Sequence, residues 1–311
     1  MLYPKLDLKL KNLLLLIIFM NLTPAITTTI TIALKGKKYP VTVAGSGIPC
    51  LAIGIGILVQ RTLSSRFKNN FKVYSAELYW DGRYELDNPQ ELTLETIVDD
   101  IIELGRALRL SNYVLIGHSA YGLIALECAK KYPEIIKGVI ASGTPTYSNS
   151  CIAARNTIFF EKYAELERKK IDAERRTQVA QEDLTQLTTT EKFLRTYVYR
   201  DAARYWHIPD FDCTKLWEDI VIPKVFTHFF STILPACDVI HDIERVKCPV
   251  FLAAGKSDYD CCPVELWSEI KNLPIDFMLS RFEKSGHYPH YEEQELFDLR
   301  IEEWLKSNAL I

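Results

Sequence analysis

The sequence has little of what marks several classes of protein. It contains only 13 Gly and 14 Pro in 311 residues, which excludes a collagen-like or a Gly/Pro-rich disordered chain. It has no basic excess, because 37 Lys and Arg stand against 40 Asp and Glu for a net charge of −3. A nucleic-acid partner is therefore not expected. The remaining composition, 48% hydrophobic and 25% charged, is that of a globular protein large enough for about two domains.

The eight cysteines form no C-x-x-C pair, so neither a zinc site nor a disulfide framework is predicted. Most of them stand beside apolar residues, as in Pro49-Cys50-Leu51. We therefore expect buried, reduced thiols and a cytoplasmic protein. They occupy positions 50, 128, 151, 213, 237, 248, 261 and 262.

The N-terminus allows a second interpretation of the compartment. Lys5, Lys9 and Lys11 precede the apolar run Leu13–Met20, which resembles a signal peptide in outline and would imply export. The run is shorter than the roughly 20 residues of a membrane-spanning helix, so no stable span is expected. We favour an extension over 1–26 that precedes the fold.

From residue 27 onward, strand-like and helix-like patterns alternate. Strands are predicted over 27–34, 39–43, 49–53, 71–78, 113–116, 137–141, 249–254 and 275–282. Helices are predicted over 93–110, 120–131, 263–271 and 295–307. This alternation predicts an α/β fold with a doubly wound, mostly parallel sheet. Residues 145–244 break the pattern and are mostly helical, so we expect a core of 27–144 and 245–311 with a helical cap inserted after the sixth strand.

Two features of this predicted cap leave its role open. Glu165 with Lys169, and Asp172 with Arg176, are spaced for ion pairs on a solvated helix face. A set of aromatic residues could line an apolar substrate pocket or only pack the cap helices together. This set comprises Phe159, Phe160, Tyr197, Tyr199, Tyr205, Trp206, Phe226, Phe229 and Phe230.

A candidate nucleophile lies between a predicted buried strand and a helix, in Gly117-His118-Ser119-Ala120-Tyr121-Gly122. A sharp strand-to-helix turn with small neighbours would expose the Ser119 side chain at a helix N-terminus, where developing negative charge is favoured. Tyr121 stands where G-x-S-x-G has its second glycine, so a distortion of the turn is expected.

A serine nucleophile needs a base, and the base needs an acid that orients it. His287 follows the last predicted strand and is our candidate base, with His290 as a competitor. Asp258 follows the strand before it and is our candidate acid. Asp260 is the alternative, because loop geometry two residues apart cannot be resolved from a sequence.

Two cofactor-dependent readings have less support. Gly54-Ile55-Gly56 with Glu77 resembles a dinucleotide fingerprint, but Val59 occupies the third glycine position. His287, His290 and Glu292 could ligate a metal, yet no second cluster supports such a site. We expect neither a cofactor nor a metal.

The chain order Ser119, Asp258, His287 resembles that of the α/β-hydrolase superfamily. Within it, the chain is most similar to the fold-1 serine hydrolases that include proline iminopeptidases and esterase-like enzymes. The resemblance implies that the backbone N–H groups of Ile55 and Ala120 form the oxyanion hole.

This resemblance implies a serine hydrolase that cleaves an ester or amide of a small, partly apolar molecule through an acyl-enzyme. A proline iminopeptidase-type aminopeptidase is an alternative, although Asp81-Gly82-Arg83-Tyr84 departs from that group's usual segment. A non-catalytic ligand-binding protein on the same fold is another. The sequence predicts no oligomeric state.

Overall fold

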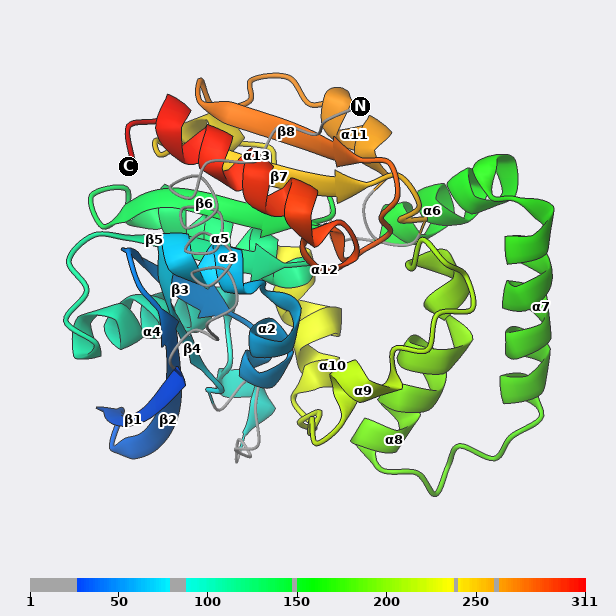
Figure 1. Ribbon diagram of the computed structural model, residues 1–311. Coiled ribbons are helices and arrows are strands. Elements are labelled where there is room, and N and C mark those ends of the chain that lie inside the picture. The colour runs from blue at the N-terminus through cyan, green and yellow to red at the C-terminus, as the bar shows by residue number, and fades with distance from the viewer. Residues whose placement is uncertain (1–26, 79–87, 147–149, 238–239, 260–262) are drawn as a thin grey trace, which may run out of the picture.

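The computed structural model describes residues 27–78, 88–146, 150–237, 240–259 and 263–311 (Figure 1). One sheet runs through these residues, with eight strands in the spatial order β1-β2-β4-β3-β5-β6-β7-β8. The strands are β1 (Thr27–Leu34), β2 (Lys37–Gly45), β3 (Ile48–Ile53), β4 (Phe71–Ala76), β5 (Tyr113–His118), β6 (Ile136–Ser142), β7 (Val250–Gly255) and β8 (Phe277–Phe282).

The sheet is antiparallel at one edge and parallel elsewhere. β1 and β2 form a hairpin through Lys35 and Gly36, whose φ angles are 48° and 75°. β2 also pairs antiparallel with β4, whereas β3 and β5–β8 join the sheet in parallel. The predicted α/β class with a mostly parallel sheet is confirmed.

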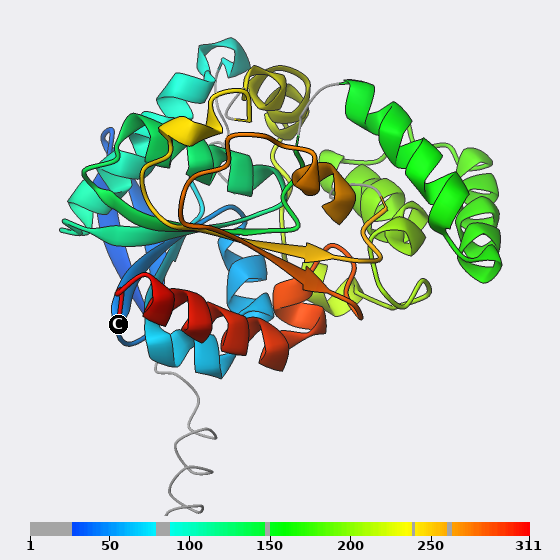
Figure 2. The ribbon, with the colours of Figure 1, turned by 90° about the horizontal axis from the view of Figure 1, so that it is seen from above.

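Helices cover both faces of the sheet, as the view from above shows (Figure 2). On one face, α4 (Leu94–Ala107) and α5 (Ala120–Lys131) bury a continuous apolar cluster against the strands. On the other face, α3 (Ser65–Asn70) and α13 (Gln294–Ser307) cover a second cluster. This two-sided burial explains why the central strands are apolar along their whole length.

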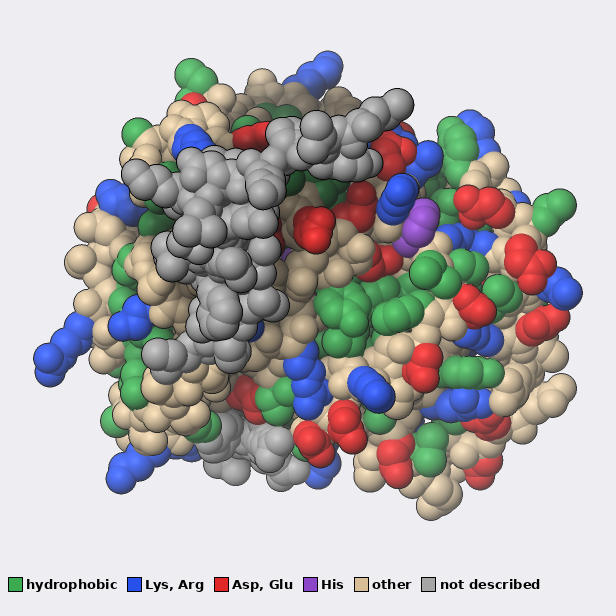
Figure 3. Space-filling view, viewed as in Figure 1, with side chains coloured by type: hydrophobic (Ala, Val, Ile, Leu, Met, Phe, Trp, Pro, Cys, Tyr) green, Lys and Arg blue, Asp and Glu red, His purple; other side chains and the backbone are tan. Residues whose placement is uncertain are grey.

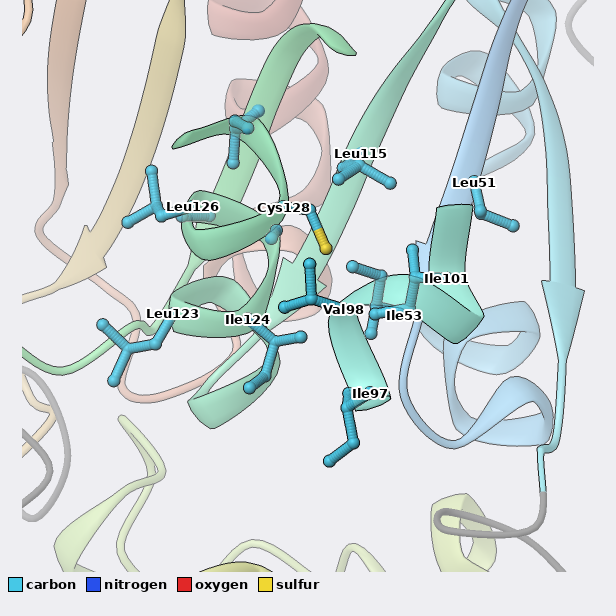
Figure 4. Packing of buried hydrophobic residues seen from close by; sticks show 14 of the residues in the cluster. Leu51, Ile53, Ile97, Val98, Ile101, Leu115, Leu123, Ile124, Leu126 and Cys128 are labelled. Atoms are coloured by element: carbon cyan, nitrogen blue, oxygen red, sulfur yellow. The ribbon is translucent and has the colours of Figure 1, made fainter. Parts of the chain in front are cut away.

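The apolar stripe of α4 is the one predicted from its spacing. Ile97, Val98 and Ile101 point toward α5 and the strands (Figure 4). Thr93 is the N-cap of the helix, and its hydroxyl oxygen accepts a hydrogen bond from the Thr96 N–H at 3.1 Å. The cap satisfies one of the N–H groups that a helix leaves unpaired at its start.

Between β6 and β7, the described residues form helices and no strand, as expected for an insertion after the sixth strand (Figure 1). The domain boundaries at 145 and 244 stay a prediction. We refer below to residues 145–244 as the cap. Its longer elements are α6 (Ser150–Tyr163), α7 (Leu166–Ala180), α8 (Thr189–Phe193), the π-helical η2 (Leu194–Arg200) and η4 (Phe229–Ile233). Shorter turns are η3 (Ala202–Arg204), α9 (Thr214–Trp217), α10 (Phe226–His228), η5 (Leu234–Ala236) and η6 (Ile243–Arg245).

The predicted Asp172–Arg176 ion pair is confirmed, whereas four other expectations about these helices and their neighbours are wrong. Lys169 pairs with Glu161, while Glu165 bonds Arg168. The charged face of α7 is not fully solvated, because Arg168 and Asp172 are buried. Other charged side chains of both signs are mixed over the surface of the cap (Figure 3). The last strand begins at 277 rather than 275, and the helix predicted over 263–271 is the shorter α11 (Val264–Ser268).

The remaining sequence expectations concern thiols and the membrane. Cys50, Cys128, Cys213, Cys237 and Cys248 are buried free thiols, and burial raises the pKa of each. The other cysteine side chains lie outside the described residues, as do residues 1–26. No helix in the described part of the chain is long and apolar enough to span a membrane.

Candidate active site

Ser119 lies in a strained turn between β5 and α5. Its φ and ψ are 58° and −131°, a combination that a non-glycine residue adopts only when its surroundings enforce it. The Ser119 N–H donates to the Ser142 carbonyl at 2.8 Å, and the Ser119 carbonyl accepts from the Gly122 N–H at 3.0 Å. These bonds hold the serine at the end of the central strands, as the sequence predicts.

The turn depends on two glycines that approach their neighbours closely. A Cβ on Gly117 would lie 2.3 Å from the Tyr121 carbonyl oxygen, and one on Gly122 would lie 1.9 Å from Thr144 Oγ1. The turn therefore forms with Gly122 one position later than in G-x-S-x-G. Tyr121 is accommodated because its ring packs over Gly54, where a Cβ would be 2.7 Å from Tyr121 Cδ2.

Asp258 and His287 form a buried pair. Asp258 Oδ2 and His287 Nδ1 are 2.7 Å apart, and both side chains are fully buried. Asp258 follows β7 and His287 follows β8, so two adjacent parallel strands deliver them to one edge of the sheet. Asp260, the alternative acid, lies outside the described residues.

The remaining ring nitrogen of His287, Nε2, is buried and has no hydrogen-bond partner among the described residues. The structure thus brings Asp258 and His287 together but records no hydrogen bond from this atom to Ser119. The His118 Nε2 atom lies 3.0 Å from the His287 carbonyl oxygen, and the two rings are 4.5 Å apart. Since His118 directly precedes Ser119, this contact places the histidine loop next to the serine turn.

His290 competes poorly with His287 as a base. Its Nδ1 lies 2.8 Å from the Ser142 hydroxyl instead of a carboxylate. Burial, together with nearby His287, lowers the pKa of His290 to about 3. Burial and the two other histidines also lower the pKa of His118 well below its usual value. His118, His287 and His290 thus form a cluster that sequence reasoning did not identify, although His118 directly precedes Ser119.

A cavity of about 310 Å³ opens at Ser119. Its polar lining comes mainly from the serine and histidine loops, and within the described part of the chain no Asp, Glu, Lys or Arg lines it. The apolar wall comes from α2 (Gly56–Thr62) and the cap. Its main apolar lining residues are Ile53, Ile55, Leu58, Val59, Leu63, Ile116, Phe193, Tyr197, Trp217, Phe226 and Phe230.

The cap aromatics divide between lining and packing. Tyr197, Phe226 and Phe230 line the cavity, as do Phe193 and Trp217, which sequence reasoning did not single out. Others of the predicted set are packing residues. Trp206 stacks on Tyr288 with ring centroids 4.5 Å apart, and Phe229 lies buried with its ring 5.5 Å from that of Tyr121.

Ile55 and Ala120 share this cavity with Ser119. Ala120 is the first residue of α5, and Ile55 is the N-cap of α2. N–H groups at helix starts have no intrahelical acceptor, and the role of these two residues as oxyanion-hole donors stays a prediction. Glu292, weighed above as a metal ligand, accepts the backbone N–H groups of Gly286 and Tyr288.

Comparisons with known proteins agree with this architecture. No known family profile matches the chain. The AB hydrolase superfamily protein YclE of Bacillus subtilis (strain 168) is 27% identical over 276 residues, which cover 85% of this chain and 93% of that protein. This relative and the fold together support the predicted assignment to the α/β-hydrolase superfamily. The predicted family and the predicted hydrolase are thereby confirmed.

Solved structures of other proteins share the hydrolase fold. An alpha/beta fold family hydrolase from Bacillus anthracis str. Sterne aligns with a TM-score of 0.67 at 22% identity, over 90% of this chain and 99% of that one. A proline iminopeptidase from Mycobacterium smegmatis aligns with a TM-score of 0.68 at 16% identity, over 91% and 99%. At these identities the likeness concerns the fold alone.

Proposed function

We propose that this α/β-hydrolase cleaves esters with an apolar acyl group through an acyl-enzyme on Ser119. The observation that carries the proposal is the buried Asp258–His287 pair, whose second ring nitrogen has no partner, beside a strained serine turn. The apolar cavity supports the acyl preference.

The chemistry follows from these positions. His287 Nε2 accepts the Ser119 hydroxyl proton while Oγ bonds to the ester carbonyl carbon. The carbonyl oxygen becomes an oxyanion that the Ile55 and Ala120 N–H groups stabilise. As the ester C–O bond breaks, His287 returns the proton to the leaving alcohol. Water then repeats the sequence on the acyl-enzyme and releases the acid.

Asp258 keeps this base in a productive state. Its carboxylate accepts the His287 Nδ1–H proton in a hydrogen bond, so that Nε2 carries the lone pair facing the nucleophile. The charge also stabilises the imidazolium that forms in each half-reaction. A pure binding protein has no need of a serine, an aspartate and a histidine in this arrangement, which argues against the non-catalytic alternative.

An aminopeptidase is less well supported than an esterase. Recognition of a substrate ammonium calls for a carboxylate at the cavity, and none lines it among the residues that the structure describes. Two of the cap carboxylates are engaged in ion pairs, since Asp172 bonds Arg204 and Arg176, and Glu182 bonds Arg195. We therefore favour an uncharged ester over a peptide with a free amino terminus.

A fluorophosphonate probe tests the proposal directly. We expect covalent labelling of Ser119 in the wild-type protein and its loss in Ser119→Ala. Ser142→Ala serves as the matched control, because Ser142 also lines the cavity. Undiminished labelling of Ser119→Ala would refute the proposed nucleophile. A panel of p-nitrophenyl esters and prolyl arylamides then separates esterase from aminopeptidase activity.

A further inference from the structure

A short stretch of the cap, residues 203–207, runs across the loops that carry Asp258 and His287; we name it the bracket segment. The Tyr259 N–H, next to Asp258, donates to the Arg204 carbonyl at 2.8 Å. The His287 N–H donates to the Tyr205 carbonyl at 2.6 Å. The approach is so close that a Cβ on Gly286 would lie 2.2 Å from the Tyr205 oxygen. The backbone position of the proposed base is therefore set in part by the cap.

Arg168 of α7 binds the bracket segment from the outer side. Its Nη1 donates to the carbonyls of Ala203 at 2.6 Å and Trp206 at 2.7 Å, and its Nη2 donates to that of His207 at 2.6 Å. The side chain is only 3% exposed. A planar guanidinium with five donors can satisfy three converging carbonyls at once, which an ammonium on a flexible stem does less well.

Glu292 of α12 (Pro289–Glu292) binds the same segment from the opposite side. Its Oε2 accepts the His207 N–H at 2.7 Å. Its Oε1 accepts the N–H groups of Gly286 at 2.8 Å and Tyr288 at 3.2 Å, the two residues that flank His287. One carboxylate thus joins the bracket segment to both sides of the base.

We propose that Arg168 is a positioning residue for His287, acting through the bracket segment, so that the cap forms part of the catalytic machinery. The inference rests on the proposed roles of Ser119 and His287. Arg168 is absent from the cavity lining, so it does not contact a substrate there directly, and the bracket segment is its link to the base. Loss of Arg168 should therefore slow the chemical step equally for short and long acyl groups. A residue that shaped the cavity would instead change the preference among them.

The test compares Arg168→Ala and Arg168→Lys with the wild-type protein. The control is Arg175→Ala on the same helix, since Arg175 bonds the carbonyls of Tyr199 and Pro209 outside the bracket segment. The measurements are the rate of Ser119 labelling by a small fluorophosphonate, kcat and KM for a short and a long p-nitrophenyl ester, the pH profile of kcat, and the melting temperature.

For Arg168→Ala we expect labelling and kcat to fall about 100-fold, the loss expected from a small misplacement of a catalytic group. The factor should be the same for both esters, KM should change little, and the pH profile should shift. Arg168→Lys should recover part of the rate, because it retains the charge and some donors. Arg175→Ala should keep the wild-type rate and pH profile.

The inference is overturned if a folded Arg168→Ala protein labels at the wild-type rate, or if only its KM for the long ester changes. If Arg168→Ala does not fold, the labelling rate and the pH profile of Arg168→Lys test the inference instead. Glu292→Gln is a second probe, because its amide group would oppose a backbone N–H and should also slow labelling. A wild-type protein that does not label at Ser119 would instead refute the proposed function.

Discussion

Replacing Asp258 with Asn would test the proposed triad at its buried contact. The His287 Nδ1 and Asp258 Oδ2 atoms are 2.7 Å apart, and neither side chain is exposed to water. An amide can donate its own proton to Nδ1, which would place the imidazole proton on Nε2, where it prevents proton abstraction from Ser119. In serine proteases the equivalent change lowers kcat about 10⁴-fold, or roughly 5.4 kcal/mol of activation free energy at 1.36 kcal/mol for each tenfold.

The assay is kcat for a p-nitrophenyl ester at saturating concentration, with circular dichroism to check folding. Asp260→Asn is the matched control, because it removes a carboxylate from the same loop without touching the proposed pair. We expect Asp258→Asn to lose most activity and Asp260→Asn to retain it. A folded Asp258→Asn enzyme with nearly wild-type kcat would refute the reasoning, and an inactive Asp260→Asn enzyme beside it would show that the acid is Asp260.

Phe230→Ala should enlarge the cavity and shift activity toward longer acyl chains, whereas Trp206→Ala should lower the free energy of unfolding by about 3–5 kcal/mol. An unchanged chain-length profile of Phe230→Ala would contradict the first expectation. An unaltered stability of Trp206→Ala would contradict the second. Burial lowers the pKa of His290 in the folded protein to about 3. Below pH 6.5 the unfolded chain therefore takes up a proton on this histidine while the folded protein does not. Stability should therefore fall with pH, by up to about 1.4 kcal/mol per pH unit. Urea titrations should give a flatter dependence for His290→Gln, and an equal slope would exclude this role. Gly122→Ala should cost about 1–3 kcal/mol of unfolding free energy, since its Cβ would meet buried Thr144; a fully stable variant would disprove the close approach.

The sequence predicted the elements whose signals are local. The span of α5 was predicted correctly, because apolar spacing acts over a few neighbouring residues. The serine turn was predicted for the same reason, since Gly117 is required by a contact within the turn itself.

The tertiary structure decided what depends on contacts across the fold. From the sequence alone, Arg168 is expected to be one more charge on a solvated helix. In the structure it is buried and donates to three carbonyls, because residues 203–207 pack against α7. Trp206 and Phe230 are both cap aromatics by sequence, but one stacks on Tyr288 and the other faces the cavity. Whether a side chain is buried depends on which residues pack against it in the tertiary structure. Residue type and spacing therefore determine the helices and strands, while contacts between distant residues determine the role of each side chain.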